Sequence, residues 1–202
     1  MLDIADRTAV IIGGGGVAAR KARGLLDAGA KVLCVSPVFS PEIPEGVGRI
    51  PDKYQPHYLN GAMLVFAATD NPEVNSAVVR DCRARGLLVN RADTDDEHPG
   101  DFAVPASHRA GNILATVSAS SPALSAMIRD KLARNFDSRW QQLADLMTGL
   151  RPAIVKSGLD VARRRQVFRD LATDKALDVL GRDGPDGLRK WLHEKYPELQ
   201  NA

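Results

Sequence analysis

The sequence is poor in cysteine, and it lacks both an excess of one charge and a long hydrophobic run. Its two cysteines, Cys34 and Cys82, form neither a CxxC pair nor a disulfide framework, which favours a reducing compartment. The 27 basic and 25 acidic side chains leave a net charge of +2, which excludes the overall basic charge typical of nucleic-acid-binding proteins. No apolar run approaches the ~20 residues of a membrane span, and the N-terminus is not the basic start of a signal peptide. We therefore expect a soluble, cytoplasmic protein that binds neither nucleic acid nor a membrane.

Two kinds of catalytic or metal-binding motif are also missing. Short-chain dehydrogenases need a Tyr-x-x-x-Lys pair, and no tyrosine in this chain has a lysine four positions later. The histidines show no metal-ligand spacing on one element, so we interpret them as solvated side chains: His57, His98, His108 and His193. We expect no resident metal.

Short apolar runs alternate with helix-like stretches from Arg7 to about Asn112. Strands are predicted for TAVIIG, KVLCVSP, AMLVFAAT and LLVNRAD, because these runs are short and rich in β-branched residues. Helices are predicted for VAARKARGLLDAGA and NPEVNSAVVRDCRARG, which end at glycines. This alternation predicts an α/β domain over residues 1–112, with a parallel sheet that binds ligands beyond the carboxyl ends of its strands.

The pattern becomes helical after a further strand candidate, GNILATVSA. From Pro122 to Leu150 the apolar residues are three or four positions apart, which predicts one long amphipathic helix or two in tandem. The remainder is typical of short helices separated by glycine and proline. The predicted segments are therefore 1–112, 113–150 and 151–202.

Four consecutive glycines stand between the first predicted strand and the first predicted helix. Gly13, Gly15 and Ala18 satisfy the pattern G-x-G-x-x-G/A, in which glycines permit a tight turn and a close approach of the backbone to a pyrophosphate. The helix that begins near Val17 would direct its first N–H groups at that ligand. A strand-to-helix turn without a ligand is the alternative, but the flanking elements favour cofactor contacts at Gly13, Gly15, Gly16, Val17 and Ala18.

The end of the second predicted strand lacks the acidic residue that usually holds the adenosine ribose of a dinucleotide. Ser36 stands at that position and is followed by Pro37; we predict that both contact the cofactor. No arginine or lysine occurs between Val32 and Phe39 to pair with a 2′-phosphate. The segment therefore favours NAD over NADP.

A polar loop, NRADTDDEHPGDF, follows the last predicted strand of the first domain. Asp93 lies at the end of this strand, beside the expected position of a nicotinamide ring. Its carboxylate could accept a proton from a substrate that loses hydride, or help to bind a metal ion. We interpret Asp95, Asp96 and Glu97 as solvated.

Candidate groups for an anionic substrate are a serine and several cations. Ser120 or Ser121 would cap the helix that starts at Pro122, and a serine in contact with an anion is the alternative. Most helix cations are solvated, yet a polycarboxylate would need several of them in one cleft. The candidates are Arg20, Lys21, Arg129 and Lys131.

Four segments together resemble the precorrin-2 dehydrogenase / sirohydrochlorin ferrochelatase family of sirohaem synthesis: VIIGGGGVAARKARGLLDAGAKVLCVSP, FAATDNPEVN, VNRADTDDEHPGDFAVPA and SPALSAMIRDKL. The resemblance implies a Rossmann-type NAD-binding domain, a dimerisation segment that exchanges with a partner chain in a homodimer, and a small all-helical C-terminal domain. It also implies NAD-dependent oxidation of precorrin-2 to sirohydrochlorin. Some members of the family also insert ferrous iron to give sirohaem.

The resemblance also implies site residues. Asp93 matches the family's aspartate implicated in both reactions, and Ser121 matches a family serine by its place before proline. The residues implied on the cofactor side are Thr69, Asp70, Asn75 and Asn90. Arg20, Lys21 and Ser121 are the candidates for substrate contact. Two features depart from the family pattern: VSASSP lacks a glycine pair, and the segment between Asp93 and Phe102 is longer.

Two other functions stay open at this point. A non-catalytic NAD-sensing module would use the same glycine turn, although a sensor has no need of an aspartate at the nicotinamide end. A chelatase that lacks the dehydrogenase activity is the other alternative. No methyltransferase domain is recognised in the 202 residues, so we expect precorrin-2 to be supplied by another protein.

Overall fold

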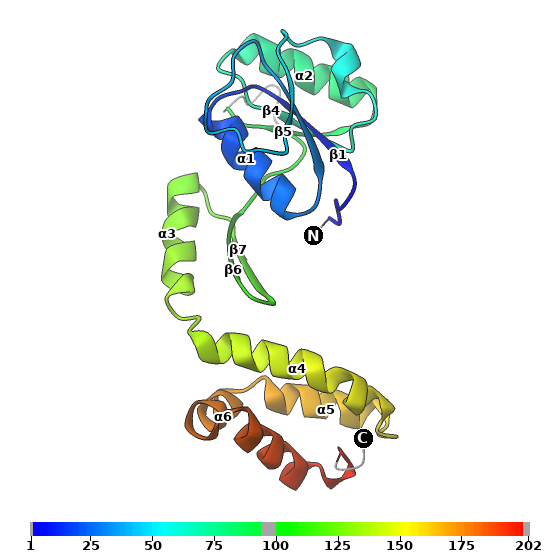
Figure 1. Cartoon of the computed structure of the whole chain (residues 1–202), viewed down its shortest axis with the longest axis vertical. Coiled ribbons are helices and arrows are strands. Elements are labelled where there is room, and N and C mark those ends of the chain that lie inside the picture. Colours follow the sequence, from blue (N-terminus) through cyan, green and yellow to red (C-terminus); the bar gives the residue numbers. More distant parts are fainter. Residues whose placement is uncertain (1, 94–99, 200–202) are drawn as a thin grey trace. The chain divides into compact units, whose positions relative to one another are not determined.

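The computed structural model describes residues 2–93 and 100–199, which belong to two compact units, Met1–Val104 and Pro105–Ala202 (Figure 1). Their boundary lies before strand β6 (Ala106–Ala110), whose residues fall within the expected first segment, 1–112. Strand β6 pairs antiparallel with β7 (Ile113–Val117), and this hairpin assigns both strands to the second unit.

The first unit is a five-stranded parallel sheet in the order β3-β2-β1-β4-β5, so the predicted Rossmann-type α/β fold is confirmed. Strand β3, with three residues, was not predicted. In chain order the elements are β1 (Thr8–Ile12), α1 (Gly16–Asp27), β2 (Lys31–Val35), β3 (Gly48–Ile50), the 3-10 helix η1 (Pro56–Leu59), β4 (Leu64–Ala67), α2 (Pro72–Ala84) and β5 (Leu88–Arg91).

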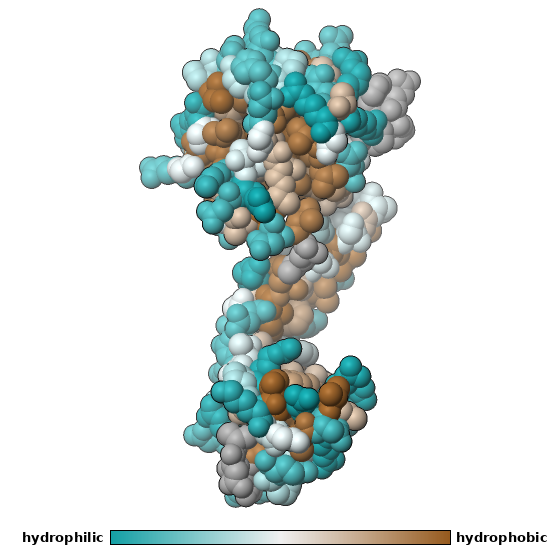
Figure 2. Space-filling view, turned by 90° about the vertical axis from the view of Figure 1, so that its right-hand side faces the viewer, coloured by the Kyte–Doolittle hydropathy of each residue, from teal (hydrophilic) through white to brown (hydrophobic). Residues whose placement is uncertain are grey.

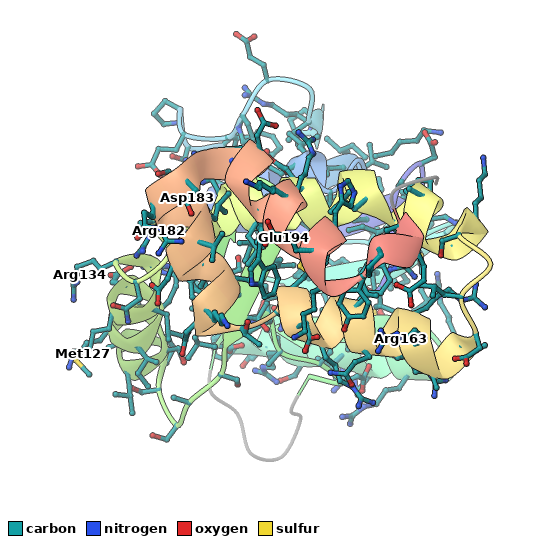
Figure 3. The ribbon with its side chains drawn as sticks, turned by 90° about the horizontal axis from the view of Figure 1, so that it is seen from below. Met127, Arg134, Arg163, Arg182, Asp183 and Glu194 are labelled. Carbon is teal, nitrogen blue, oxygen red and sulfur yellow. The ribbon has the colours of Figure 1, made fainter. Side chains whose placement is uncertain are left out.

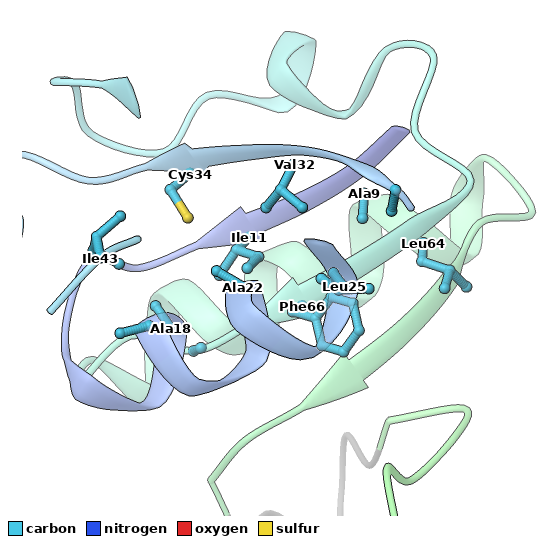
Figure 4. Close-up of a cluster of buried hydrophobic side chains, with 13 residues drawn as sticks. Ala9, Ile11, Ala18, Ala22, Leu25, Val32, Cys34, Ile43, Leu64 and Phe66 are labelled. Atoms are coloured by element: carbon cyan, nitrogen blue, oxygen red, sulfur yellow. The ribbon is translucent and has the colours of Figure 1, made fainter. Parts of the chain in front are cut away.

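The strands are apolar on both sides because helices cover both faces of the sheet. Ala18, Ala22 and Leu25 of α1 pack against Ile11 and Phe66 on one face (Figure 4). On the other face, α2 packs against the sheet through three buried residues: Val78, Val79 and Cys82. Each fully buried Val, Leu, Ile or Phe side chain contributes about 1.5–3 kcal/mol relative to an exposed one. This core holds the carboxyl ends of the strands at one edge.

The second unit contains the β6–β7 hairpin and four helices. Their bounds are α3 (Pro122–Ala133), α4 (Ser138–Lys156), α5 (Val161–Leu171) and α6 (Asp174–Lys195), followed by the 3-10 helix η2 (Pro197–Leu199). Of the two arrangements expected between Pro122 and Leu150, the structure has two helices in tandem. Asp137 begins the second one, because its side chain accepts a hydrogen bond from the Arg139 amide. The expected boundary at Leu150 falls inside α4.

Helices α4, α5 and α6 share a core that includes Ile154, Val167 and Leu188. Helix α6 bends at Gly184, which has a positive φ of 70° and precedes Pro185. The predicted helical C-terminal part is therefore confirmed.

Hydrophobic residues are also visible at the surface (Figure 2). On α3 they are Leu124, Met127 and Leu132, which are 37, 49 and 37% exposed. The side chains of Met127 on α3 and of Arg134, which follows this helix, project outward (Figure 3). None of the helices in the described part of the chain is long and apolar enough to span a membrane.

Candidate functional site

A cleft of about 940 Å³ lies at the carboxyl ends of the central strands. It is lined by the turn from β1 to α1, the end of β2, the segment that follows β3, and the turn from β4 to α2. Parallel α/β sheets bind ligands at this edge because the loops there diverge to opposite faces of the sheet. The cleft lies entirely within the first unit.

The first two glycines of the cluster are required by close packing. A Cβ on Gly13 would lie 2.2 Å from the Ala68 carbonyl oxygen, and Gly13 has a φ of 130°. A Cβ on Gly14 would lie 2.3 Å from the Val38 carbonyl oxygen. At Gly15, by contrast, a Cβ would meet no atom within 4 Å. The chain can therefore turn tightly and still leave open space above the start of α1.

The amino end of α1 is open for an anion. Gly15 is the N-cap and offers no side-chain acceptor, and the first turn contains no acidic residue. The first amides of a helix have no acceptor within the helix, and the helix dipole is positive at this end. At α2 the Asn71 side chain already accepts from the amides of Glu73 and Val74. The glycine turn and the amino end of α1 therefore fit the pyrophosphate of a dinucleotide.

Most residues predicted to contact the cofactor line this cleft. They are Gly13, Gly15, Gly16, Val17, Ser36, Pro37, Thr69 and Asp70. Ala18, Asn75 and Asn90 are buried and do not line it. The Ser36 hydroxyl donates to the Val38 carbonyl at 2.8 Å, which fixes the chain where β2 ends.

Asn75 is buried beside Thr69, which lines the wall of the cleft. Its side-chain oxygen accepts from the amide and hydroxyl of Thr69, at 3.1 and 2.8 Å. Its side-chain nitrogen donates to the Thr69 carbonyl at 3.1 Å. A hydrogen bond from Asn75 also helps to lower the pKa of Asp93. The fully buried Asn75 thus fixes Thr69 in the wall of the cleft.

Asp93 is held by an arginine that was not singled out in the sequence. Arg91 is the last residue of β5, and its Nε and Nη2 donate to the two carboxylate oxygens of Asp93 at 2.7 and 3.0 Å. Nη1 donates to the Ser76 hydroxyl and Nη2 to the Pro72 carbonyl, at 3.0 and 3.2 Å. The Arg91 side chain is 1% exposed and that of Asp93 is 30% exposed. Bidentate, charge-assisted pairs of this kind fix both groups.

The pKa of Asp93 is lowered from its usual range. The main cause is the hydrogen bond from Arg91; burial opposes it, and the hydrogen bond from Asn75 adds to it. Asp93 is therefore a carboxylate at neutral pH, with part of its surface open to a substrate.

Lys21, a candidate for substrate contact, has a structural partner. Its ammonium donates to the Asn90 side-chain oxygen at 2.6 Å and lies 5.2 Å from the centre of the Phe66 ring. Asn90 in turn donates to the Phe102 carbonyl at 2.7 Å. Burial is the main cause that lowers the pKa of Lys21, and the charge of Arg20 adds to it. These contacts favour a structural role for Lys21 over substrate contact.

Two further residues were predicted to contact the substrate, Arg20 and Ser121. Arg20 is exposed on α1. In the second unit, the Ser121 hydroxyl accepts from the Leu124 amide at 3.2 Å and so caps α3. The predicted solvated acids Asp95, Asp96 and Glu97 lie outside the described residues. Among the residues that are described, no group of three or more His, Cys, Asp or Glu could hold a metal ion.

The sequence interpretation missed part of the cleft wall. Lys53 and Tyr54 follow the unpredicted strand β3, and Val38 follows β2. Glu73 and Ala77 come from the start of α2. The position of Lys53 in the cleft could not be predicted, because the preceding strand, GRI, is too short to show the alternating pattern of a strand.

The parallel sheet, the open helix end and the glycine turn define a dinucleotide-binding α/β protein. A family model described as putative NAD(P)-binding matches residues 1–106, just over half of the chain. The chain belongs to this family, and its cofactor is a nicotinamide dinucleotide.

The chain is also similar to siroheme synthases. It is 32% identical over 196 residues to the siroheme synthase of Tolumonas auensis, and 33% identical over 186 residues to that of Chromobacterium violaceum. These alignments cover 94 and 89% of this chain but 42 and 39% of the relatives. The chain therefore spans about two fifths of the length of these curated relatives.

A solved structure of SirC, precorrin-2 dehydrogenase, has the same fold. The TM-score is 0.77 at 24% sequence identity, with 97% of this chain and 98% of that chain covered. At this identity the match shows a shared fold.

Proposed function

We propose that this chain oxidises precorrin-2 to sirohydrochlorin with NAD as the hydride acceptor, a step of sirohaem synthesis. The observation that supports this most directly is Asp93, a partly exposed carboxylate that the buried Arg91 holds with two hydrogen bonds, while Arg91 also donates to Pro72 at the start of α2. The names of the siroheme synthase relatives and of SirC, precorrin-2 dehydrogenase, suggest the tetrapyrrole substrate.

Different residues of the chain bind the cofactor and accept the proton. The open amides at the start of α1 bind the pyrophosphate, and Thr69 and Asp70 lie on the nicotinamide side of the cleft. Ser36 and Pro37 contact the adenosine ribose, and the absence of an arginine or lysine between Val32 and Phe39 supports NAD. When bound, NAD accepts a hydride from the reduced macrocycle. Asp93 accepts the proton that the substrate loses with it.

The partners follow from the same proposal. Arg20 and Ser121 are the remaining candidates for the substrate's carboxylates. A cytoplasmic homodimer, formed through residues 113–150, stays a prediction, and the apolar residues exposed on α3 support it.

The test is an anaerobic assay of the purified chain with precorrin-2 and NAD. We expect formation of NADH together with sirohydrochlorin. If NAD binds without any turnover, the chain is an NAD-sensing module and the proposal is wrong. A separate reaction with sirohydrochlorin and ferrous iron, without NAD, shows whether the chain is also a chelatase, since Asp93 could accept the pyrrole protons that iron displaces. Chelation in the absence of dehydrogenase activity would also contradict the proposal.

Replacing Arg91 tests the ionisation of Asp93. Because Arg91 is the main cause of the lowered pKa of Asp93, we expect Arg91→Met to raise that pKa. Asp93 is then protonated at higher pH, so the acid limb of the pH–rate profile moves to higher pH. By linkage, the pair stabilises the fold at neutral pH, and this contribution is lost as the pH falls through the folded-state pKa of Asp93.

The controls separate this effect from a merely structural one. Arg91→Lys keeps the charge and is expected to shift the acid limb less. Arg80→Met removes an exposed arginine from α2 and is expected to leave the profile unchanged. An unchanged acid limb in Arg91→Met would exclude Asp93 as the group whose ionisation limits the rate.

A further inference from the structure

We propose that Lys53 binds the 2′-phosphate on the adenosine ribose of NADP, and that it allows this chain to bind NADP as well as NAD. The inference rests on the cofactor part of the proposed function and is independent of the substrate. It starts from the juxtaposition of Lys53 with the end of β2, where the local sequence has no cation.

Strand β3 brings Lys53 to this position. Val35 of β2 is aligned with Ile50 of β3, and the Ser36 amide donates to the Ile50 carbonyl at 3.1 Å. Because the two strands are parallel, the residues that follow each of them leave the sheet at the same edge. Lys53 is three residues beyond Ile50, and it lines the cleft together with Ser36 and Pro37.

The end of the second strand is the position that distinguishes the two cofactors. In dinucleotide-binding domains an acidic residue there binds the ribose 2′-hydroxyl of NAD, and a nearby arginine accommodates the 2′-phosphate of NADP. An acidic residue also repels that phosphate. Ser36 is uncharged, so nothing at the end of β2 opposes a 2′-phosphate. An ammonium in the segment that follows the adjacent strand can attract one.

The charges in the cleft favour this assignment. Among the described residues that line the cleft, Lys53 is the one with a positive charge, and the acidic ones are Asp70 and Glu73. Both acids belong to the turn and helix that follow β4, which is on the other side of β1 from β2.

The residues around Lys53 hold its backbone in place and leave its ammonium accessible. The Tyr54 hydroxyl donates to Asp81 of α2 at 2.7 Å. The neighbouring carboxylate of Asp52 accepts from the Lys53 amide at 2.7 Å and from the Tyr58 hydroxyl at 2.6 Å. Lys53 is exposed, and among the described residues its ammonium forms no ion pair within 4.0 Å, although its charge helps to lower the pKa of Asp52. A phosphate can thus bind it without breaking an existing ion pair.

The test measures binding of two nucleotides that differ only at the 2′ position, adenosine 2′,5′-bisphosphate and 5′-AMP, by calorimetry with the full chain. We expect the parent to bind the bisphosphate at least as tightly as 5′-AMP. Lys53→Gln is expected to weaken binding of the bisphosphate about tenfold and to leave the affinity for 5′-AMP within about twofold of the parent's. A contact between a phosphate and an ammonium contributes roughly a tenfold ratio in affinity. The difference is expected to shrink at high salt, because both groups are close to solvent.

Lys31→Gln is the matched control. Lys31 is exposed at the amino end of β2, where it pairs with Asp6 at 4.0 Å. We therefore expect Lys31→Gln to leave the affinities for both nucleotides unchanged. A parent that binds the bisphosphate tenfold more weakly than 5′-AMP would overturn the proposal. So would a Lys53→Gln variant that weakens both nucleotides equally.

The outcomes for Lys53 and for the proposed function are separable. If precorrin-2 is not oxidised but the Lys53→Gln ratio is as expected, the substrate assignment fails and the role of Lys53 stands. If neither nucleotide binds, the cofactor cleft itself is wrong and both proposals fail.

Discussion

Asp93→Asn is expected to lower the rate of precorrin-2 oxidation by about a hundredfold or more, because a positioned general base contributes roughly 10²- to 10⁴-fold. Asparagine keeps the shape of the side chain and can still accept from Arg91, but it cannot take a proton. The affinity for NAD is expected to stay within about twofold, since Asp93 does not line the cofactor cleft. The measurements are the initial rate of NADH formation and the dissociation constant of NAD.

The control for Asp93 is another aspartate of the same unit. Asp27 is exposed at the carboxyl end of α1, and Asp27→Asn should keep the parent's rate. A melting curve is needed for each variant, because Asp93→Asn also weakens a charge-assisted pair with the buried Arg91. A folded, NAD-binding Asp93→Asn protein that turns over at the parent's rate would exclude Asp93 as the base.

Gly13→Ala is expected to destabilise the fold by more than about 3 kcal/mol, and to abolish NAD binding with it. Its Cβ would overlap the Ala68 carbonyl oxygen, and its φ of 130° is unfavourable for alanine. The clash and the unfavourable φ are both features of the backbone, so no side-chain rotation relieves them. Urea unfolding and NAD titration measure the two effects.

Gly15→Ala tests cofactor binding separately from the stability of the fold. Gly15 has a φ of −83°, which alanine adopts freely, and its Cβ would meet no atom within 4 Å. We therefore expect the parent's urea midpoint together with weaker NAD binding, because the methyl group occupies space that the pyrophosphate needs. If Gly13→Ala were as stable as the parent, or if Gly15→Ala bound NAD unchanged, our description of the turn would be wrong.

The elements with strong local patterns could be predicted from the sequence. Strands β1, β2, β4 and β5 are short β-branched or apolar runs, and α1 and α2 show helical spacing with glycine stops. Strands β3 and β6 could not be predicted, because the first has three residues and the second reads ASHRA, with a weak apolar side. Apolar spacing alone did not show the break between α3 and α4. Asp137, an N-cap in front of Ser138, is the signal that distinguishes two helices from one.

Some residues of the candidate site could also be predicted from the sequence, and others could not. The glycine turn and Ser36 follow from a motif within one βαβ unit, and the structure places them in one cleft. Lys53 could not be predicted because it reaches the cleft through a sheet neighbour distant in sequence. Arg91 is only two residues from Asp93, but a strand residue's partner depends on the twist and packing at that strand's end. The buried position of Arg91 under α2 is a tertiary feature.

The most direct test of the central claim is the molar ratio of NADH to sirohydrochlorin formed by the purified chain from precorrin-2 under anaerobic conditions. A dehydrogenase of the proposed kind gives one NADH for each sirohydrochlorin, at a rate that Asp93→Asn reduces. Sirohydrochlorin that accumulates without NADH, or no product above the protein-free reaction, would contradict the account.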